Sequence, residues 1–267
     1  MPELPEVETR VREMRPLCVG RTIVGVRLQW ARHVEPLLPS EFEQQILGQE
    51  ILAVERRAKY LVFRLSRQDL LIHLRMSGDL SVVASGTPYE KHDHTTLGFD
   101  NHTELRFNDA RKFGRATLVA SAEQFTAHLG PEPLDPAFTA VVLYQRLQNS
   151  NRALKPLLLD QTFLAGVGNI YCDEALFASG LHPLRLASSL SEQEVALLWQ
   201  NIRQVLWDGI ARNGASIDWV YRGGSQQHHF AVYGRTHQPC LTCGTPIQRL
   251  VVGQRGTHIC PQCQPSG

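Results

Sequence analysis

The chain lacks any long apolar run and any recognisable export segment. Its 267 residues are 43% hydrophobic and 20% charged, and no stretch approaches the roughly 20 consecutive apolar residues of a membrane-spanning helix. The start lacks the basic segment and apolar core that mark a signal peptide. We therefore expect neither anchor nor signal peptide, a cytoplasmic location, and a length that suits two medium-sized domains.

Acidic residues are missing from the last part of the chain. No Asp or Glu occurs from residue 219 to residue 267, where four arginines remain: Arg222, Arg235, Arg249 and Arg255. This segment also contains four cysteines. If they bind one zinc ion as thiolates, they and the ion contribute −4 + 2 = −2, so the net charge of the segment is 4 − 2 = +2. The whole chain has a net charge of only +1. Anion binding must therefore come from individually placed arginines rather than from a strong overall field.

The strongest local signal is a pair of Cys-x2-Cys motifs separated by sixteen residues, formed by Cys240, Cys243, Cys260 and Cys263. This spacing is typical of a four-thiolate zinc site, and two disulfides are the disfavoured alternative in a chain without an export signal. Residues 246–259 alternate like two strands around a turn that carries Arg255 at its tip. Four protein ligands leave zinc no open position, so we expect one structural Zn2+ ion.

The first six residues, Met-Pro-Glu-Leu-Pro-Glu, suggest a reactive end. Removal of Met1 would leave Pro2 with a free secondary amine, close to the carboxylates of Glu3 and Glu6. Such an amine can attack a sugar carbon and form an iminium, and its pKa starts near 8, well below that of lysine. The alternative is a terminus with two chance prolines. The rest of the chain decides between them.

An amphipathic helix is predicted to follow. Apolar residues recur every three or four positions from Leu4 to Cys18, with charged residues between them. Pro5 suits the first helical position, and Pro16 should stop or kink the helix. The positive end of this helix would disfavour a protonated amine just ahead of it, which would help to keep the Pro2 nitrogen reactive.

Residues 20–120 have β character. A short helix over 40–47, capped by Ser40, interrupts the β-type runs. Eight such runs separated by turns predict a sandwich or a barrel. They cover residues 22–28, 51–54, 60–65, 70–74, 80–83, 95–99, 104–107 and 116–120.

The pattern then becomes helical. Three prolines within residues 129–136 indicate an interdomain hinge, and helices are predicted over 139–148 and 191–213. Between them, a glycine turn leads into a helix that starts near Asn169. Its first turn and the Asn169 amide could bind a phosphate, although most glycine turns only reverse the chain. Cys18 and Cys172 are expected in the core, and the adjacent His228 and His229 in a solvated loop.

Several motifs occur in the order seen in formamidopyrimidine-DNA glycosylases, which the chain resembles over its whole length. They are Pro2-Glu-Leu-Pro-Glu-Val-Glu, Arg57-Ala-Lys-Tyr, His73-Leu-Arg-Met-Ser-Gly, Asp109-Ala-Arg-Lys-Phe-Gly, Gly166-Val-Gly-Asn-Ile-Tyr, Tyr233-Gly-Arg and the four-cysteine hairpin. The resemblance implies an α+β fold. A catalytic helix and β-sandwich would occupy 1–130, a hinge 131–138, a helical DNA-binding domain with a helix-two-turn-helix 139–231, and the zinc hairpin 232–267, with double-stranded damaged DNA between the domains.

The resemblance also implies a reaction. The family excises oxidised purines, such as 8-oxoguanine and formamidopyrimidines, and then cuts the strand at the abasic site. Pro2 matches the nucleophile and Glu3 the general acid/base at the sugar, while Lys59 matches a lysine beside the sugar and its phosphate. Two successive eliminations would leave a one-nucleotide gap, and the enzyme would work as a monomer.

Six further positions match DNA-contacting residues of the family. His73, Asn169 and Arg255 match groups that bind phosphates flanking the lesion. The damaged base must leave the stack, and the vacated space must be filled. Met76, Arg111 and Phe113 match the side chains inserted there, with Arg111 facing the orphaned partner base. Without the resemblance, Met76 and Phe113 would be assigned to the core.

Two departures from the family pattern, and one different class of function, leave alternatives open. The loop over 219–232, which in the family caps the everted base, is a few residues shorter than usual, and this opens the oxidised-pyrimidine activity of the related endonuclease VIII group. Glu6 matches a second acidic position near the lesion. A non-catalytic zinc-containing DNA-binding protein is the other alternative, but it gives no reason for the Pro-Glu start or for Lys59.

Overall fold

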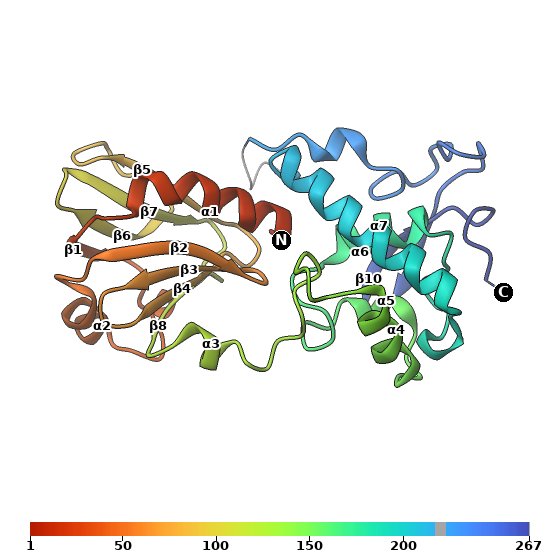
Figure 1. Cartoon of the computed structure of the whole chain (residues 1–267). Helices are drawn as coiled ribbons and strands as arrows, with labels where there is room; N and C mark the ends of the chain where they lie inside the picture. Colours follow the sequence, from red (N-terminus) through yellow and green to blue (C-terminus); the bar gives the residue numbers. More distant parts are fainter. Residues whose placement is uncertain (217–222, 267) are drawn as a thin grey trace. The chain divides into compact units, whose positions relative to one another are not determined.

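The structure is a computed structural model that describes residues 1–216 and 223–266 (Figure 1). Two compact units share the chain. One comprises Met1–His128 with Ala215–Gly224, and the other Leu129–Gly214 with Ser225–Gly267. The proline-rich segment 131–138 contains no helix or strand. None of the helices in the described ranges is long and apolar enough to cross a membrane.

Helix α1 (Leu4–Cys18) opens the first unit and follows the predicted pattern. Its apolar stripe is buried, at 0–3% exposure, and comprises Leu4, Val7, Val11, Met14 and Cys18. The prediction for Pro16 was wrong about the end of the helix, which continues to Cys18 with Pro16 inside its last turn. Burial of the Cys18 thiol raises its pKa to about 12, as expected of a core residue.

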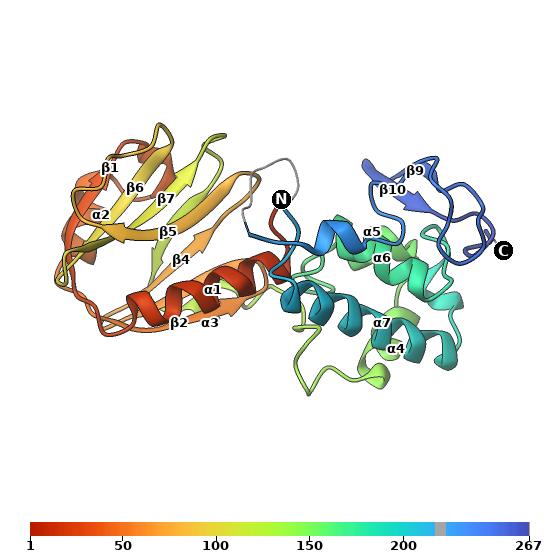
Figure 2. The same cartoon turned by 90° about the horizontal axis from the view of Figure 1, so that it is seen from above.

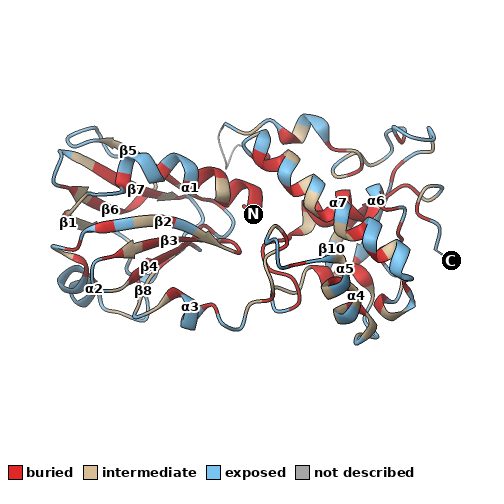
Figure 3. Ribbon diagram, viewed as in Figure 1, coloured by how far each residue is buried: buried red, intermediate tan, exposed pale blue. Residues whose placement is uncertain are grey.

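The eight predicted β-runs form two antiparallel four-stranded sheets, so the sandwich is confirmed (Figures 1 and 2). One sheet has the order β1-β6-β7-β5, from β1 (Ile23–Leu28), β6 (Asp93–Phe99), β7 (Thr103–Asp109) and β5 (Gly78–Ala84). The other has the order β2-β3-β4-β8, from β2 (Ile51–Arg57), β3 (Tyr60–Leu65), β4 (Asp69–His73) and β8 (Arg115–Val119). Side chains of both sheets and of α1 share one hydrophobic core, whose members are among the buried residues in Figure 3.

Short helices complete this unit. Helix α2 (Pro39–Ile46) starts one residue earlier than predicted, with Leu38 rather than Ser40 at the cap. Pro39 takes the first helical position, and the Glu41 carboxylate accepts the Leu38 N–H at 2.9 Å. The 3-10 helix η1 (Ala31–His33) and helix α3 (Ala122–Phe125) were not predicted.

The second unit is mainly helical, as predicted. Its helices are α4 (Ala140–Gln148), α5 (Leu154–Leu158), α6 (Asn169–Ala178) and α7 (Glu192–Ala211), with the 3-10 helices η2 (Ala187–Ser189) and η3 (Gln226–His229). Helix α7 has the predicted capping box between Ser191 and Glu194. The glycine turn before α6 is fixed by Gln161, which accepts the Gly166 N–H and donates to the Val167 carbonyl.

A β-hairpin of β9 (Gln248–Val252) and β10 (Arg255–Ile259) completes the second unit (Figure 2). The Val252–Arg255 pair is closed by Gly253 and Gln254, whose φ angles of 54° and 61° are typical of a type I′ turn. Arg255 is therefore the first residue of β10 rather than the tip of the turn, and its side chain is exposed.

Candidate functional site

The start of α1 buries two carboxylates beside Pro2. Glu3 and Glu6 are 3% and 2% exposed, and Pro2 is buried with them. One Glu6 oxygen accepts the Glu3 N–H and the other accepts the Ala215 N–H, both at 2.8 Å. Glu6 thus links the first turn of α1 to the backbone of Ala215. Both of its oxygens serve backbone groups, which suits an anchoring role.

Lys59 and His73 lie at one end of the second sheet. Lys59 belongs to the two-residue connection between β2 and β3, and His73 ends β4 opposite Tyr60. Their side chains are 6% and 8% exposed. Burial, together with the positive charges of Arg75 and Lys59, lowers the pKa of His73 to about 3. The ring is therefore uncharged at neutral pH. Because Nδ1 accepts the Arg75 N–H at 3.0 Å, Nε2 carries the hydrogen.

Three residues of the candidate site are exposed on turns of the first unit. Met76 is 37% exposed and Phe113 50% exposed, and Arg111 is exposed as well. The Arg111 guanidinium lies 5.2 Å from the centre of the Phe113 ring. Two large apolar side chains with this exposure contribute little to the core, although their residue types alone would have placed Met76 and Phe113 there.

Asn169 and Arg255 belong to the second unit, where the hairpin packs on α6. The Asn169 Nδ2 donates to the Gly256 carbonyl at 2.9 Å, so one amide hydrogen already holds the hairpin. Its Oδ1 is buried without a hydrogen-bond partner among the described residues. A phosphate seat would therefore use the remaining amide hydrogen and the first turn of α6 rather than the whole side chain.

A buried ion pair beneath the hairpin was missed by the sequence analysis. Lys155 and Asp173 are both completely buried, with Nζ 2.6 Å from Oδ1. Lys155 also donates to Thr257 Oγ1 at 2.8 Å, and the other Asp173 oxygen accepts the His258 N–H at 2.9 Å. The only signal in the sequence is a lysine in an otherwise apolar stretch before Asp160. The pair fixes the hairpin, and with it Arg255, against α5 and α6.

Left-handed backbone conformations mark the same turns. Ala58, Arg75, Lys112 and Gln254 have φ between 52° and 61°, and each adjoins a candidate site residue: Lys59, Met76, Arg111 and Phe113, or Arg255. Non-glycine residues adopt this region at a cost, and such residues concentrate at functional sites. None of the four belongs to the residue types that commonly adopt it, so residue type alone does not predict these conformations.

The four cysteines of the second unit converge. Their sulfurs all lie within 4.8 Å of one another, and the Cys240–Cys263 and Cys243–Cys260 pairs are 3.9 and 3.4 Å apart. A disulfide would need about 2.05 Å, whereas a tetrahedral site with zinc–sulfur bonds of about 2.3 Å places sulfurs about 3.8 Å apart. The Thr242 N–H donates to Cys240 Sγ at 3.4 Å. The set fits one structural zinc ion.

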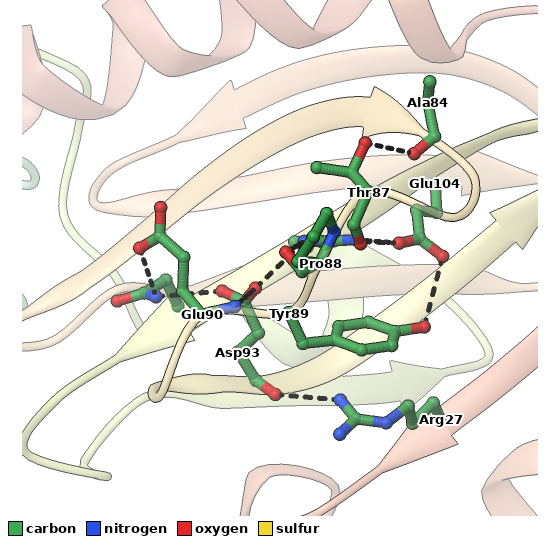
Figure 4. A network of polar contacts seen from close by, with 10 residues as sticks. Arg27, Ala84, Thr87, Pro88, Tyr89, Glu90, Asp93 and Glu104 are labelled. Atoms are coloured by element: carbon green, nitrogen blue, oxygen red, sulfur yellow. Dashed lines mark hydrogen bonds and ion pairs between the residues drawn. The ribbon is translucent and has the colours of Figure 1, made fainter.

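An open hollow of about 700 Å³ lies on the first unit beside Ser77 and Asp79. Loop 85–92 forms one wall. The Arg106 guanidinium donates to the Pro88 carbonyl within this loop at 2.9 Å and to Asp93, just after it, at 3.3 Å. On the same side, Arg27 donates to the Asp93 carbonyl and the Tyr89 hydroxyl donates to Glu104 (Figure 4). The Tyr89 ring lies between the guanidinium groups of Arg106 and Arg27, at 4.4 and 3.8 Å. Paired charges thus give the hollow a fixed, polar wall.

Comparison with known proteins places these features in a family. The model of the formamidopyrimidine-DNA glycosylase N-terminal domain matches residues 1–116, that of the H2TH domain residues 129–220, and that of the zinc finger found in FPG and IleRS residues 238–265. Formamidopyrimidine-DNA glycosylase from Herpetosiphon aurantiacus is 47% identical over 272 residues, covering 99% of this chain and 100% of the relative. The enzyme from Geobacillus kaustophilus is 44% identical over 273 residues, with the same coverage.

Comparison with solved structures indicates the same family as the sequence comparison. The Lactococcus lactis protein in complex with DNA containing N7-benzyl-Fapy-dG matches with a TM-score of 0.93 and 36% identity, covering 99% of this chain and 100% of that chain. A MutM structure in complex with DNA containing carbocyclic 8-oxo-G matches with a TM-score of 0.93 and 37% identity, at the same coverage. Since sequence and fold match along nearly the whole length, the chain belongs to the formamidopyrimidine-DNA glycosylase family.

Proposed function

We propose that the protein is a bifunctional DNA glycosylase and abasic-site lyase of base excision repair. It excises oxidised purines, 8-oxoguanine and formamidopyrimidines, from double-stranded DNA, and acts as a cytoplasmic monomer. The observation that carries this proposal is the buried Pro2-Glu3 start of α1, in a chain that matches its relatives end to end. Relatives named for this activity, and related structures with lesion-containing DNA, support it.

The chemistry starts at the Pro2 nitrogen once Met1 is removed. Its lone pair attacks the deoxyribose carbon that holds the damaged base, and the base leaves with the electrons of the broken bond. Glu3 moves protons at the sugar and helps the ring to open. The resulting iminium acidifies neighbouring sugar protons, so two eliminations expel the two phosphates in turn. The positive end of α1 helps to keep the nitrogen unprotonated for the first step.

Phosphate binding is assigned to four residues. Lys59 and Arg255 supply positive charge, whereas His73 and Asn169 supply neutral donors. His73 can donate only through Nε2–H, because Nδ1 already accepts the Arg75 N–H. Met76, Arg111 and Phe113 fill the space left by the everted base, and their exposure on turns supports this role. Lys155 and Asp173 serve the reaction only through the hairpin that presents Arg255.

One alternative substrate class stays open. The short loop over 219–232 motivates oxidised pyrimidines, and its residues 219–222 lie outside the described part of the chain. The Pro-Glu-Leu-Pro start and the complete set of inserted side chains favour purines. Non-catalytic DNA binding does not account for Glu3 buried beside Pro2.

Borohydride trapping tests the proposal. Two duplexes are compared, one with 8-oxoguanine opposite cytosine and one with an oxidised pyrimidine opposite its normal partner. We expect a covalent adduct that forms faster on the purine. A chain with one extra residue ahead of Pro2 keeps every side chain but blocks the amine, so it should bind DNA without forming an adduct. Mass spectrometry should find the active chain starting at Pro2.

Each other outcome has a meaning. Faster trapping of the pyrimidine would keep the mechanism and change the substrate. Binding without an adduct on either duplex would refute the enzyme assignment. So would a fully active chain that retains Met1.

A further inference from the structure

A single buried carboxylate connects the turns that carry the three inserted side chains. Asp109, the last residue of β7, is completely buried. Its Oδ1 accepts the Ser77 hydroxyl and, at 3.3 Å, the Arg111 N–H. Its Oδ2 accepts the Gly114 N–H at 2.7 Å. The Arg111 N–H also donates to Ser77 Oγ at 2.9 Å, which closes the link between two segments 34 residues apart.

The three residues bound by this carboxylate are the immediate supports of the inserted side chains. Ser77 directly follows Met76, and Gly114 directly follows Phe113. Arg111 is held by its own backbone N–H. The backbone that carries all three side chains is therefore held by one group, the Asp109 carboxylate. A shift of the Asp109 carboxylate would therefore move all three together.

The carboxylate itself is held from the other side. His33 is completely buried, with Nε2 3.5 Å from Asp109 Oδ2 and Nδ1 2.9 Å from Thr95 Oγ1. Its ring stacks on Phe107 with centroids 4.6 Å apart. Burial alone would raise the pKa of Asp109, but the His33 ring 3.5 Å away and the hydrogen bonds from Ser77 and Gly114 outweigh it and lower the pKa to about 2. Asp109 is ionised at neutral pH.

Packing leaves the turn no room to relax. A Cβ atom on Gly114 would lie 2.3 Å from Cζ of Phe107 and 3.0 Å from Oδ2 of Asp109. Lys112, between Arg111 and Phe113, already has a φ of 60°. The turn over 109–114 is thus pressed onto the sheet while its side chains remain exposed.

We propose that Asp109, held by Ser77 and His33, is the positioning residue that sets the arrangement of the three inserted side chains. This inference rests on the proposed function, since it concerns the space left by the everted base. Asp109 touches no reacting atom. Its effect should appear where a duplex must be opened and its partner base replaced, and not where the sugar is already accessible.

Ser77→Ala and Asp109→Asn test the role. Each weakens a hydrogen bond to an ionised group, so kcat/KM on an 8-oxoguanine duplex should fall about tenfold to a hundredfold. A single-stranded abasic oligonucleotide has no partner base to replace, so its cleavage does not depend on the inserted side chains. The rate of this lyase reaction should therefore change less than about twofold. The preference for cytosine over adenine opposite the lesion should narrow. Fluorescence of 2-aminopurine beside the lesion reports the insertion directly.

Matched variants separate positioning from folding. Ser77→Thr keeps the hydroxyl and should restore most of the duplex activity. Ser81→Ala makes the same change at an exposed position of β5 and should behave like wild type. Equal losses on the duplex and on the single strand would show a general folding defect and overturn the inference. So would unchanged duplex kinetics and opposite-base preference in both variants of an active enzyme. A wild-type protein that cleaves neither substrate would instead overturn the proposed function, and this inference with it.

Discussion

His73 is an uncharged hydrogen-bond donor in this fold, although a histidine in water carries a positive charge below about pH 6.5. Burial and the neighbouring Arg75 and Lys59 together lower its pKa to about 3. The unfolded chain therefore binds one more proton than the folded chain between those two values. The stabilisation from neutral His73 is complete above pH 6.5 and is lost as the pH falls toward 3.

His73→Gln should reveal this proton. The difference in free energy of unfolding between wild type and the variant should shrink as the pH falls from 7 to 4. The slope cannot exceed one proton, about 1.4 kcal/mol per pH unit. Urea unfolding at each pH measures it, with the exposed His229→Gln as the control. A difference that stays constant over this range would contradict the buried neutral ring.

At the scale of elements, the hairpin and helices α5 and α6 depend on one ion pair. Lys155→Met would leave the Asp173 carboxylate buried without its cation, because both side chains are completely buried. Removing one partner of such a pair costs about 3–5 kcal/mol. Urea unfolding should show this loss in the single variant. Adding Asp173→Asn should recover part of it, because the charge is removed while one oxygen can still accept the His258 N–H. A single variant as stable as the double variant would argue against the pair.

Elements were predictable from the sequence where one periodicity decides them. The stripe from Leu4 to Cys18 gave α1, and the eight alternating runs gave both sheets, because burial of one face fixes both patterns. The predicted stop of α1 at Pro16 and the predicted Ser40 cap of α2 were wrong. One proline was tolerated in a last turn, and the other took the first helical position. Local capping signals compete, and tertiary packing chooses between them.

The candidate site was predictable only where a motif is contiguous. The cysteine spacing and the Pro-Glu start can be recognised directly in the amino-acid sequence. The Asp109 cluster joins His33, Ser77 and Gly114, which are far apart in sequence, and no periodicity links them. Likewise, the left-handed conformations of Ala58 and Lys112 are imposed by the turns around them, since neither residue type favours that region.

At the scale of the whole molecule, a net charge of +1 limits how this protein can bind DNA. Affinity cannot come from a general positive field, so it must come from a few placed groups. Among the phosphate contacts proposed above, Lys59 and Arg255 are charged, whereas His73 and Asn169 are neutral. Only charged contacts release counterions from the duplex. The salt dependence of binding therefore distinguishes the two kinds of contact.

Arg255→Ala should lower the affinity, because one phosphate contact with a cation is lost. The slope of log K against log salt should become less negative by about 0.9 for the same reason. His73→Ala should lower the affinity but leave the slope unchanged, because the lost donor is neutral. Fluorescence anisotropy on a duplex with a stable abasic analogue, across a series of salt concentrations, measures both. Arg12→Ala removes the same formal charge from an exposed side chain paired with Glu8, and it should change neither value. If Arg12→Ala reduced the slope as much as Arg255→Ala, net charge rather than placement would govern binding. A reduced slope in His73→Ala would mean that the ring becomes protonated against the phosphate.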